Sequence, residues 1–548
     1  MRFTTTSLFA LTLLAIAAPA VAQDDEDSGV SEGRRLDLAP YIEASQVVSA
    51  ELSPGNDVVT YTQLAAGVDA SFGTRNSQGA VSLRYERQIG WDDAGDVDTI
   101  SGIARTSLSV IPRTLTLEAG AMASRSRFEG NGATSLGGFG DDASSTGQIY
   151  ALYAGPSVQA EVGQVQVTGA YLLGYTRVES PDSVIIAPGA DPVDVFDESV
   201  THRATVRAGI APGDVLPVGL GVGAGWNRQD ISNLDQRIDD RNVRADVTVP
   251  VTRELALVGG VGYEEVEVSS RDALRDTNGA PVIGSDGRLV TDQTGPRRIA
   301  YETDGLIWDV GVMWRPSRRT SFSASVGKRY GSTTYYGALS YAPNQRTAIN
   351  ISVYDGITSF GGMTVNSLDA MGADFQAIRN PITGDLSGCV ANAAGSTTGS
   401  NCALAGLGSI RSAVFRSRGV SATVSRSVGR SSFGLGAGYD RRKYIAAAGT
   451  ALAAVNGLVD ENYWVSFYAG RQLDRQSSLA FNASGVWFES GSDSTGQALG
   501  YSASLSYNRD FLAGLSGTAA VGFDGVERDE SLTDYSAASA LLGLRYTF

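Results

Sequence analysis

WDVGVMWRPSRRTSFSASVGKRYGSTTYYGALSYAPNQRTAINISVYDGITSFG, residues 308–361, is the stretch that decides the fold. Just before and within it, apolar residues alternate with mostly polar ones, at Leu306, Trp308, Val310, Val312 and Trp314. A period of two predicts a strand with one apolar and one polar face. Turn residues such as Pro343-Asn344 separate four segments of this kind. The pattern is typical of transmembrane β-strands with a lipid face, an aromatic girdle and a polar lumen, although a soluble sandwich alternates too.

The N-terminus predicts export. An apolar run over Leu8–Ala18 follows Arg2, and the small residues Ala20-Val21-Ala22 come next, which is the pattern of a cleaved signal peptide. We therefore expect a signal peptide over residues 1–22, an acidic periplasmic segment over 23–35 and a barrel over 36–548. No later apolar run has the length of a membrane helix, so we expect the exported chain to cross a membrane only as a barrel.

The C-terminal strand supports this prediction. Its apolar residues all lie on one parity: Ala538, Ala540, Leu542, Leu544, Tyr546 and Phe548. A final aromatic residue after such a run resembles the assembly signal of bacterial outer-membrane barrels. It implies the cell outer membrane as the location, and lipopolysaccharide and the barrel assembly machinery as partners.

Composition narrows the class further. The mean hydropathy of the 548 residues is -0.06, as expected where apolar and polar faces cancel. The net charge of -16 argues against nucleic acid as a partner, because nucleic-acid binding needs a basic footprint.

The spacing of turns predicts the architecture. From Leu36 we expect about 22 strands, an even number as single-chain bacterial barrels require. Tight turns such as Gly429-Arg430 alternate with long loops such as 271–297 and 361–410. The sequence thus predicts an all-β, transmembrane antiparallel up-and-down barrel with both termini in the periplasm and no plug domain. We expect the longest loop, 361–410, to fold inward and narrow the lumen.

If apolar positions face lipid, the opposite parity faces the lumen. The charged residues on that parity are Arg84, Arg105, Arg203, Arg207, Arg244, Arg315, Arg329, Arg442, Asp69, Glu86, Glu118, Asp246, Glu264 and Asp309. A lumen that carries both signs of charge offers a hydrated path with a transverse field. Solvated wall residues that pair with one another would give the same pattern.

Three basic clusters are expected near the outer ends of strands: Arg125/Arg127, Arg416/Arg418 and Arg441-Arg442-Lys443. They fit three roles: contact with lipopolysaccharide phosphates, a collar for an anionic polymer, or simple capping of strand ends.

Few residues suggest other chemistry. Cys389 and Cys402 share one loop of an exported chain, which predicts a local disulfide. With His202 as the single histidine, no metal site is expected, and the Asp-Gly and Asn-Gly loops near 276–287 lack the ligand spacing of an EF-hand. No catalytic motif occurs, so we expect neither a cofactor nor an enzyme.

The block Trp308–Gly361 resembles the outer-membrane β-barrel family associated with exopolysaccharide and PEP-CTERM systems of Gram-negative bacteria. The matching elements are the strand Trp308–Pro316, Arg319-Thr320, the corner Gly327–Gly331 and the end Val353–Gly361. The motif is structural and carries no catalytic residue. The resemblance implies a link to polysaccharide secretion or surface assembly, with periplasmic polysaccharide-export components as partners.

These observations lead to three expectations of function. The first is a passive or gated conduit or scaffold for exopolysaccharide export. The alternatives are a porin for small solutes and a structural or adhesive surface barrel with a blocked lumen. A TonB-dependent receptor has a barrel of this size, but only an acidic stretch precedes the first expected strand, which leaves no room for a plug and disfavours coupled uptake.

Overall fold

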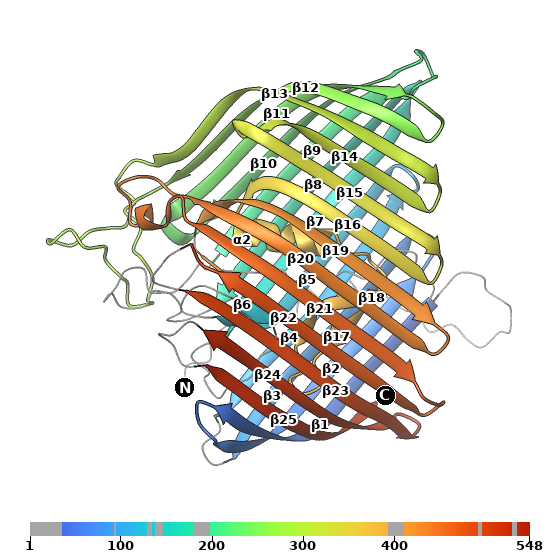
Figure 1. Ribbon diagram of the computed structural model, residues 1–548, viewed down its shortest axis with the longest axis vertical. Coiled ribbons are helices and arrows are strands. Elements are labelled where there is room, and N and C mark those ends of the chain that lie inside the picture. Colours follow the sequence, from blue (N-terminus) through green and yellow to red (C-terminus); the bar gives the residue numbers. More distant parts are fainter. Residues whose placement is uncertain are drawn as a thin grey trace. The chain divides into compact units, whose positions relative to one another are not determined.

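The structure, a computed structural model, describes residues 35–91, 95–128, 134–136, 146–179, 198–392, 410–411, 413–491, 496–528 and 534–548. Its framework is an antiparallel sheet in which the first strand, β1, pairs with β2 on one side and with the last strand, β25, on the other (Figure 1). The sheet has 23 strands in the described residues. Because β6 has three residues and pairs only with β5, the ring itself has 22. The predicted all-β antiparallel barrel of this size is confirmed.

The ring strands are β1 (Arg35–Ser53), β2 (Val58–Gly73), β3 (Ser77–Trp91), β4 (Val97–Ile111), β5 (Leu115–Phe128), β7 (Thr146–Val162), β8 (Val165–Glu179), β9 (Glu198–Ile210), β10 (Gly219–Ile231), β11 (Gln236–Pro250), β12 (Leu255–Ser270), β13 (Arg298–Ser317), β14 (Thr320–Arg329), β15 (Ser332–Asn344), β16 (Thr347–Thr358), β19 (Val414–Val428), β20 (Ser431–Ile445), β21 (Val459–Gln472), β22 (Ser477–Glu489), β23 (Gln497–Leu512), β24 (Leu515–Arg528) and β25 (Tyr535–Thr547). The remaining elements are β6 (Thr134–Leu136), α2 (Phe360–Asp369), β17 (Phe375–Arg379), β18 (Leu386–Asn392), η2 (Asn233–Asp235) and η4 (Ala453–Val455).

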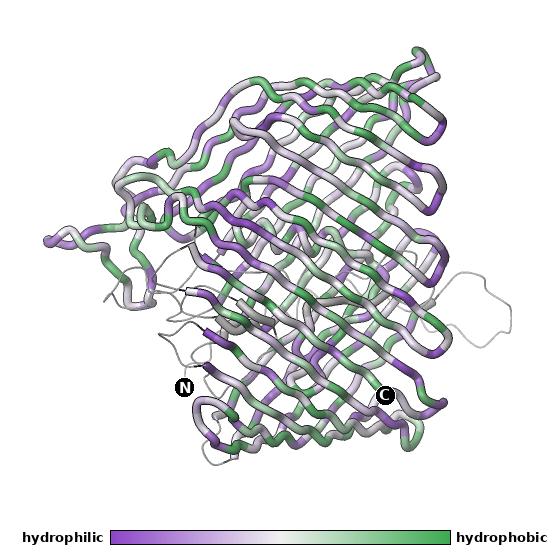
Figure 2. Tube along the Cα trace, viewed as in Figure 1, coloured by the Kyte–Doolittle hydropathy of each residue, from purple (hydrophilic) through white to green (hydrophobic). Residues whose placement is uncertain are grey.

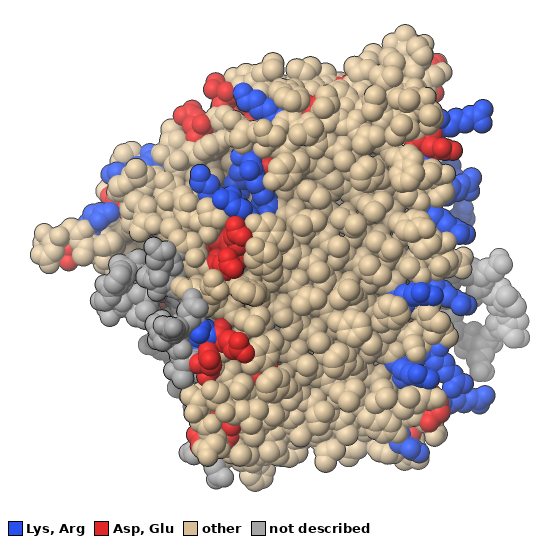
Figure 3. Space-filling model, viewed as in Figure 1, with Lys and Arg blue, Asp and Glu red and all other residues tan. Residues whose placement is uncertain are grey.

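The outer surface of the ring is apolar. On β13, Leu306, Trp308 and Val310 are exposed, whereas Asp309 faces inward and pairs with Arg244. Figure 3 shows a broad belt of this outer surface with few charged residues between two charged rims, and apolar positions recur along the strands in Figure 2. A belt of this kind is the lipid-facing surface of an outer-membrane barrel. The protein is therefore an outer-membrane β-barrel. None of the described helices has the length and hydropathy to span a bilayer.

The strand register places both ends of the described barrel at one rim. Arg35 lies opposite Gly73, beside the short β2–β3 turn, and Tyr41 lies opposite Thr547. The tight turns at this rim include Gly429 and Gly514 at positive φ, a conformation that glycine adopts without steric cost. Short turns identify this rim as periplasmic. The predicted signal peptide, the acidic segment and the absence of a preceding plug concern residues before Arg35, which lie outside the described residues.

Inward-facing aromatic rings lie against glycines of the neighbouring strand. Trp464 packs over Gly438 and Tyr468 over Gly434, so closely that a Cβ atom at either glycine would collide with the ring. The alternating glycines of β20 therefore hold large rings flat against the wall. This packing leaves space in the lumen that upright rings would fill.

The segment after β16 turns into the barrel, as expected for the loop 361–410. Where the sequence predicts a long loop, the segment forms the helix α2 and the hairpin β17–β18 (Figure 1). Ser359 begins α2 as its N-cap, because its hydroxyl accepts a hydrogen bond from the backbone N of Gly362 at 3.1 Å. We call the described part of this segment, residues 359–392, the lumen insert.

Three extracellular connections pack on one another. Leu234 of η2, Ala273 and Leu289 of the loop 271–297, and Leu452 beside η4 form one buried apolar cluster. Arg271 and Arg297 both donate to Asp235, which adds an ionic contact between two of these loops. Residues from three separate loops thus form a single cap.

Asp272 links two of these loops and makes the cap sensitive to acid. Its carboxylate accepts hydrogen bonds from the Arg275 side chain and from the backbone N of Ala451. Burial opposes ionisation, but these bonds outweigh it and hold the pKa of Asp272 below its ordinary value. Because its pKa is depressed, the ionised carboxylate of Asp272 stabilises the contact at neutral pH. This contribution to stability is lost as pH falls through the pKa in the folded state.

We therefore expect hydrogen exchange of the loop 271–297, corrected for intrinsic rates, to rise between about pH 5 and pH 3. Asp272→Asn should exchange faster at neutral pH and lose most of this pH dependence. An unchanged exchange rate for the wild-type loop over that range would contradict the assigned role of Asp272.

Candidate functional site

The lumen insert is the feature of the described lumen that can control passage. Its two parts contact different sides of the ring. The helix α2 contacts β5, β7, β8 and β9, whereas β17 contacts β3 and β18 contacts β21. Because these strands lie far apart around the ring, the insert spans the lumen between them.

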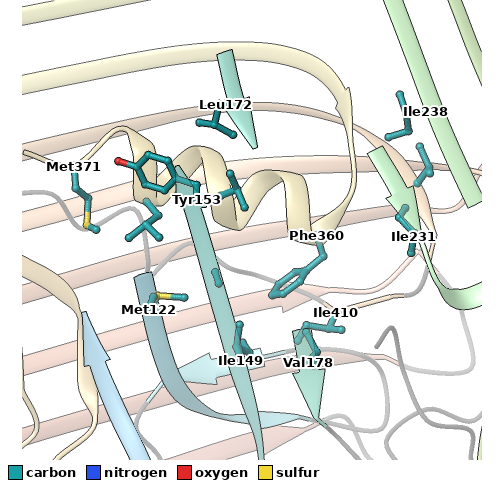
Figure 4. Close-up of a cluster of buried hydrophobic side chains, with 14 of the residues drawn as sticks. Met122, Ile149, Tyr153, Leu172, Val178, Ile231, Ile238, Phe360, Met371 and Ile410 are labelled. Atoms are coloured by element: carbon teal, nitrogen blue, oxygen red, sulfur yellow. The ribbon is translucent and has the colours of Figure 1, made fainter. Parts of the chain in front are cut away.

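Apolar packing holds α2 to the wall. Phe360, Val365, Leu368 and Met371 are buried against inward-facing residues (Figure 4). The wall residues of this cluster include Met122, Ile149, Tyr153, Leu172, Val178, Ile231 and Ile238. On β8, Leu172 is buried on the inner face, whereas its neighbour Leu173 is exposed on the outer face. The strand is therefore apolar on both faces where α2 docks. This local loss of alternation marks the docking surface.

Polar contacts fix the two ends of α2. At its start, Gln229 accepts hydrogen bonds from the backbone N and the hydroxyl of Ser359 at 3.0 and 2.8 Å. At its end, Arg203 donates to Asp369 at 2.5 Å and to Asn366 at 2.6 Å. The Arg203 and Asp369 side chains retain 36% and 26% of their exposure, so this ion pair is partly hydrated.

The β17–β18 end is held by buried charge. Arg379 donates to the hydroxyls of Ser82 and Ser101, to the backbone O of both serines, and to the backbone O of Gly384. Arg125 donates to Asp385 through two nitrogens at 2.8 and 3.1 Å, and the Asp385 side chain is only 1% exposed. These bonds tie the hairpin to β3, β4 and β5.

A second buried group supports the same hairpin. Arg84 pairs with Glu43 and Glu86, at 2.9 and 2.8 Å, directly against Gly384. Gly384 has a φ of 67°, and a Cβ atom there would collide with the Arg84 side chain. Glycine at this position therefore allows the hairpin to approach the charged wall closely.

The other predicted lumen charges pair mostly with one another. Arg207 and Arg244 share Asp246, and Arg244 also binds Asp309. Arg105 lies 3.6 Å from Glu118, Arg442 binds Asp440, Arg329 binds Asp240 and Glu264, and Asp69 accepts from Arg545. Arg315 lies exposed at the periplasmic end of β13. These charged residues occupy the strand positions that alternate with the exposed apolar residues. Their functional role as the lining of the lumen stays a proposal.

The basic clusters expected at the outer rim are bound within the protein. Arg125 reaches the lumen insert instead of lipid, and Arg416 and Arg418 both bind the buried Asp355 at 2.7 and 3.0 Å. Arg441 contacts Glu461. The Arg127 side chain lies outside the described residues, as do Cys402 and the Cys389 side chain, so the local disulfide stays a prediction.

Sequence reasoning missed the insert side of these contacts. Asp369, Arg379 and Asp385 lie in a segment without strand periodicity, so no parity assigned them a direction. Gln229 faces the lumen but is uncharged and was not singled out. The one usable signal in the sequence was the dipeptide Gly384-Asp385, which predicts a turn but does not predict the ion pair of Asp385.

A chamber of about 1050 Å³ remains between α2 and the strands from β9 to β19. It extends from Thr358, which leads into α2, to Ser321 and Asn350 near the periplasmic starts of β14 and β16. Its size is at the upper end of the range of small-molecule sites.

The short β14–β15 turn forms part of the chamber's extracellular edge. Tyr330 is buried there, its backbone N donates to Glu264 at 2.5 Å and its hydroxyl donates to Asp240 at 3.2 Å. Glu264 and Asp240 belong to β12 and β11, so the turn leans inward across the wall.

Comparison with known proteins gives structural likeness only. No family model matches the chain, and no curated protein matches it. Similar solved structures include the FrpB iron transporter (F5-1 variant) of Neisseria meningitidis, with a TM-score of 0.44, 11% identity and coverage of 93% of this chain and 83% of that one. The closed form of the ferric-catecholate import receptor Fiu of E. coli K12 gives a TM-score of 0.45 at 9% identity, covering 94% and 83%. The siderophore receptor PirA of Acinetobacter baumannii gives 0.41 at 10% identity, covering 93% and 80%.

These matches correct the expected family and function. They are named as iron transporters and siderophore receptors, so the resemblance of Trp308–Gly361 to exopolysaccharide and PEP-CTERM barrels is wrong. The expected export conduit or scaffold, its periplasmic export partners, and the porin and adhesive alternatives are wrong with it. The physical reason is that a strand–turn–strand pattern recurs in any barrel hairpin and does not identify a cargo.

Proposed function

We propose that the protein imports a ligand across the outer membrane and that the lumen insert is its movable closure. The observation that carries this proposal is the insert's set of contacts around the ring, which leaves one chamber beside it. A static pore would need no segment packed across its lumen. A closure that holds a ligand-sized chamber fits selective uptake better than free diffusion.

The two halves of the insert are held unequally. Arg203 and Asp369, at α2, are partly hydrated, and an exposed or half-exposed ion pair contributes about 1 kcal/mol or less. Arg125 and Asp385, at the hairpin, are 13% and 1% exposed, and breaking a buried pair costs about 3–5 kcal/mol. We infer that β17–β18 remains anchored by its buried ion pair during transport and that α2, which is held by non-directional apolar packing and one hydrated ion pair, moves.

A reversible disulfide tests whether α2 moves. A Cβ atom built on Gly174 lies 3.3 Å from the Cβ of Val365, close to the separation found in disulfides. Gly174→Cys with Val365→Cys should therefore lock α2 to β8. To prevent mispairing, both changes belong in a background with Cys389→Ser and Cys402→Ser. We expect ligand uptake by cells to stop in the oxidised variant and to return on reduction.

The matched controls are Val365→Cys and the pair Gly174→Cys with Val365→Ala, since a Cβ atom on Gly174 would lie 2.7 Å from the Cγ1 of Val365. Both controls should transport in both redox states. The panel of radiolabelled ligands should include iron complexes, because the similar structures are named for iron and ferric-catecholate transport. Uptake that continues when mass spectrometry shows the lock to be complete would refute a moving α2.

A further inference from the structure

The chamber wall carries an unusual excess of uncharged polar side chains. Fifteen of its 36 lining residues are Ser, Thr, Asn or Gln, whereas six are charged. The polar residues gather on four adjacent strands, β14, β15, β16 and β19. Such a wall presents hydrogen-bond donors and acceptors in close succession without a net field.

The strand register sets these side chains in straight rows. One row runs Ser321, Ser340, Asn350 and Thr423 across four strands, each residue opposite the next. The adjacent row contains Ser323, Ser352 and Ser421 and ends, beyond Gly438, at Trp464. Neighbouring strands lie about 4.8 Å apart, so the first row offers four polar groups at this spacing. In the second row, Ala338 lies between Ser323 and Ser352.

The hydroxyls and amides of this wall are available to a ligand. In the described part of the chain, the side chains of Ser340, Asn350, Ser352, Ser421 and Thr423 make no hydrogen bond to another protein group. By contrast, Ser484 and Ser502, farther around the same ring, bind each other at 2.7 Å. Free donors and acceptors in a wall would bind water until a polar ligand replaces it.

The charges of the chamber cancel. The charged lining residues are three arginines and three aspartates: Arg105, Arg203, Arg329, Asp240, Asp355 and Asp369. Each aspartate is bound by an arginine, namely Asp240 by Arg329, Asp369 by Arg203 and Asp355 by Arg416. A site for an anion would direct uncompensated arginines at the ligand.

Aromatic rings complete the wall. Trp464 and Tyr354 line the chamber, and each lies over a glycine of a neighbouring strand, Gly438 and Gly419. Trp464 is only 6% exposed and belongs to a cluster with Ile378, so the partly exposed ring of Tyr354 is the aromatic face beside the rows of hydroxyls. This combination suits a ligand with apolar C–H faces and many hydroxyl groups.

From this arrangement we propose that the chamber binds a short, uncharged oligosaccharide as the imported ligand. The inference rests on the proposed import function and names its substrate class. Hydroxyls of the sugar would exchange hydrogen bonds with the two polar rows, and a C–H face would stack on the ring of Tyr354. The ligand differs from an exported polymer in size and direction.

The test uses the full-length protein purified in a detergent without a sugar headgroup. Binding is measured first on an array of neutral glycans and then by calorimetry with the strongest hit and with an acidic analogue of the same length. We expect the neutral glycan to bind and the uronic-acid analogue to bind at least tenfold more weakly, since Arg203 and Arg329 are already bound to aspartates and Arg105 lies beside Glu118.

The triple variant Ser352→Ala, Ser421→Ala, Thr423→Val removes three hydroxyls at nearly constant volume. Each lost hydrogen bond weakens binding by roughly two- to tenfold, so we expect at least a tenfold loss overall. Thr423→Ser should bind as the wild type does, and Ser484→Ala is the matched control outside the chamber. The heat-dependent gel mobility of the barrel reports that each variant is folded.

Three results would overturn the substrate class. The first is that the protein binds no neutral glycan of the array. The second is that the acidic analogue or a ferric catecholate binds more tightly than the neutral glycan. The third is that the triple variant binds the neutral glycan as tightly as the wild type does. Each would leave the import proposal standing, because the disulfide lock tests movement of α2 without reference to the chemistry of the ligand.

Discussion

Replacing residues 360–412 with a short Gly-Ser linker is expected to convert a closed barrel into a conducting pore. The deletion is geometrically simple, because Thr358 lies opposite Phe415 on neighbouring antiparallel strands that a short turn can join. A 22-stranded ring without lumen contents is wide enough for a broad aqueous channel. Planar-bilayer recordings should therefore show large, steady conductance steps for the deletion and none for the intact protein.

The control removes part of an extracellular loop instead of the insert. Deleting residues 276–287 shortens the projecting part of the loop 271–297 and should leave the barrel closed. In cells, the insert deletion alone should increase sensitivity to vancomycin, a solute too large for ordinary porins. If the intact protein and the deletion conduct equally, the insert does not close the lumen.

Asp385→Ala is expected to detach the hairpin end of the insert. The change leaves the guanidinium of Arg125 in a buried site without its carboxylate, which costs about 3–5 kcal/mol of insert docking. Arg379 and the hydroxyl of Ser101, which donates to the backbone O of Gly384, then hold the hairpin to β3 and β4. We expect faster proteolysis between β17 and β19 and intermittent conductance steps.

The double variant Arg125→Leu, Asp385→Leu should recover most of the docking, since removing both charges avoids an unpaired one. Asp98→Ala is the exposed control: Asp98 binds Arg87 with side chains 52% and 45% exposed, and its loss should leave proteolysis close to the wild-type rate, because solvent screens such a pair. If Asp385→Ala is cleaved no faster than Asp98→Ala, the buried pair does not anchor the insert.

The sequence contains the information for the barrel because the relevant signal is local. Trp308 and Asp309 are neighbours whose side chains point to opposite faces, and this alternation persists through strand after strand. Lipid on one side and a polar lumen on the other impose that period. The periplasmic rim followed from the alternation of short turns and long loops, and the inward fold of the long loop was expected from the width of a barrel with about 22 strands.

The closure of the lumen could not be predicted in this way. Arg125 and Asp385 are separated by 260 positions, and Arg379 and Ser82 by 297, so no local period relates them. The resemblance drawn from Trp308–Gly361 was wrong for a related reason. A hairpin pattern specifies the barrel wall, but it does not specify the segment or the ligand inside the lumen. The chain's alternation determined a barrel in the outer membrane. Only ring closure and strand register, which bring distant residues together across the lumen, decided how that barrel is closed and which polar rows face its chamber.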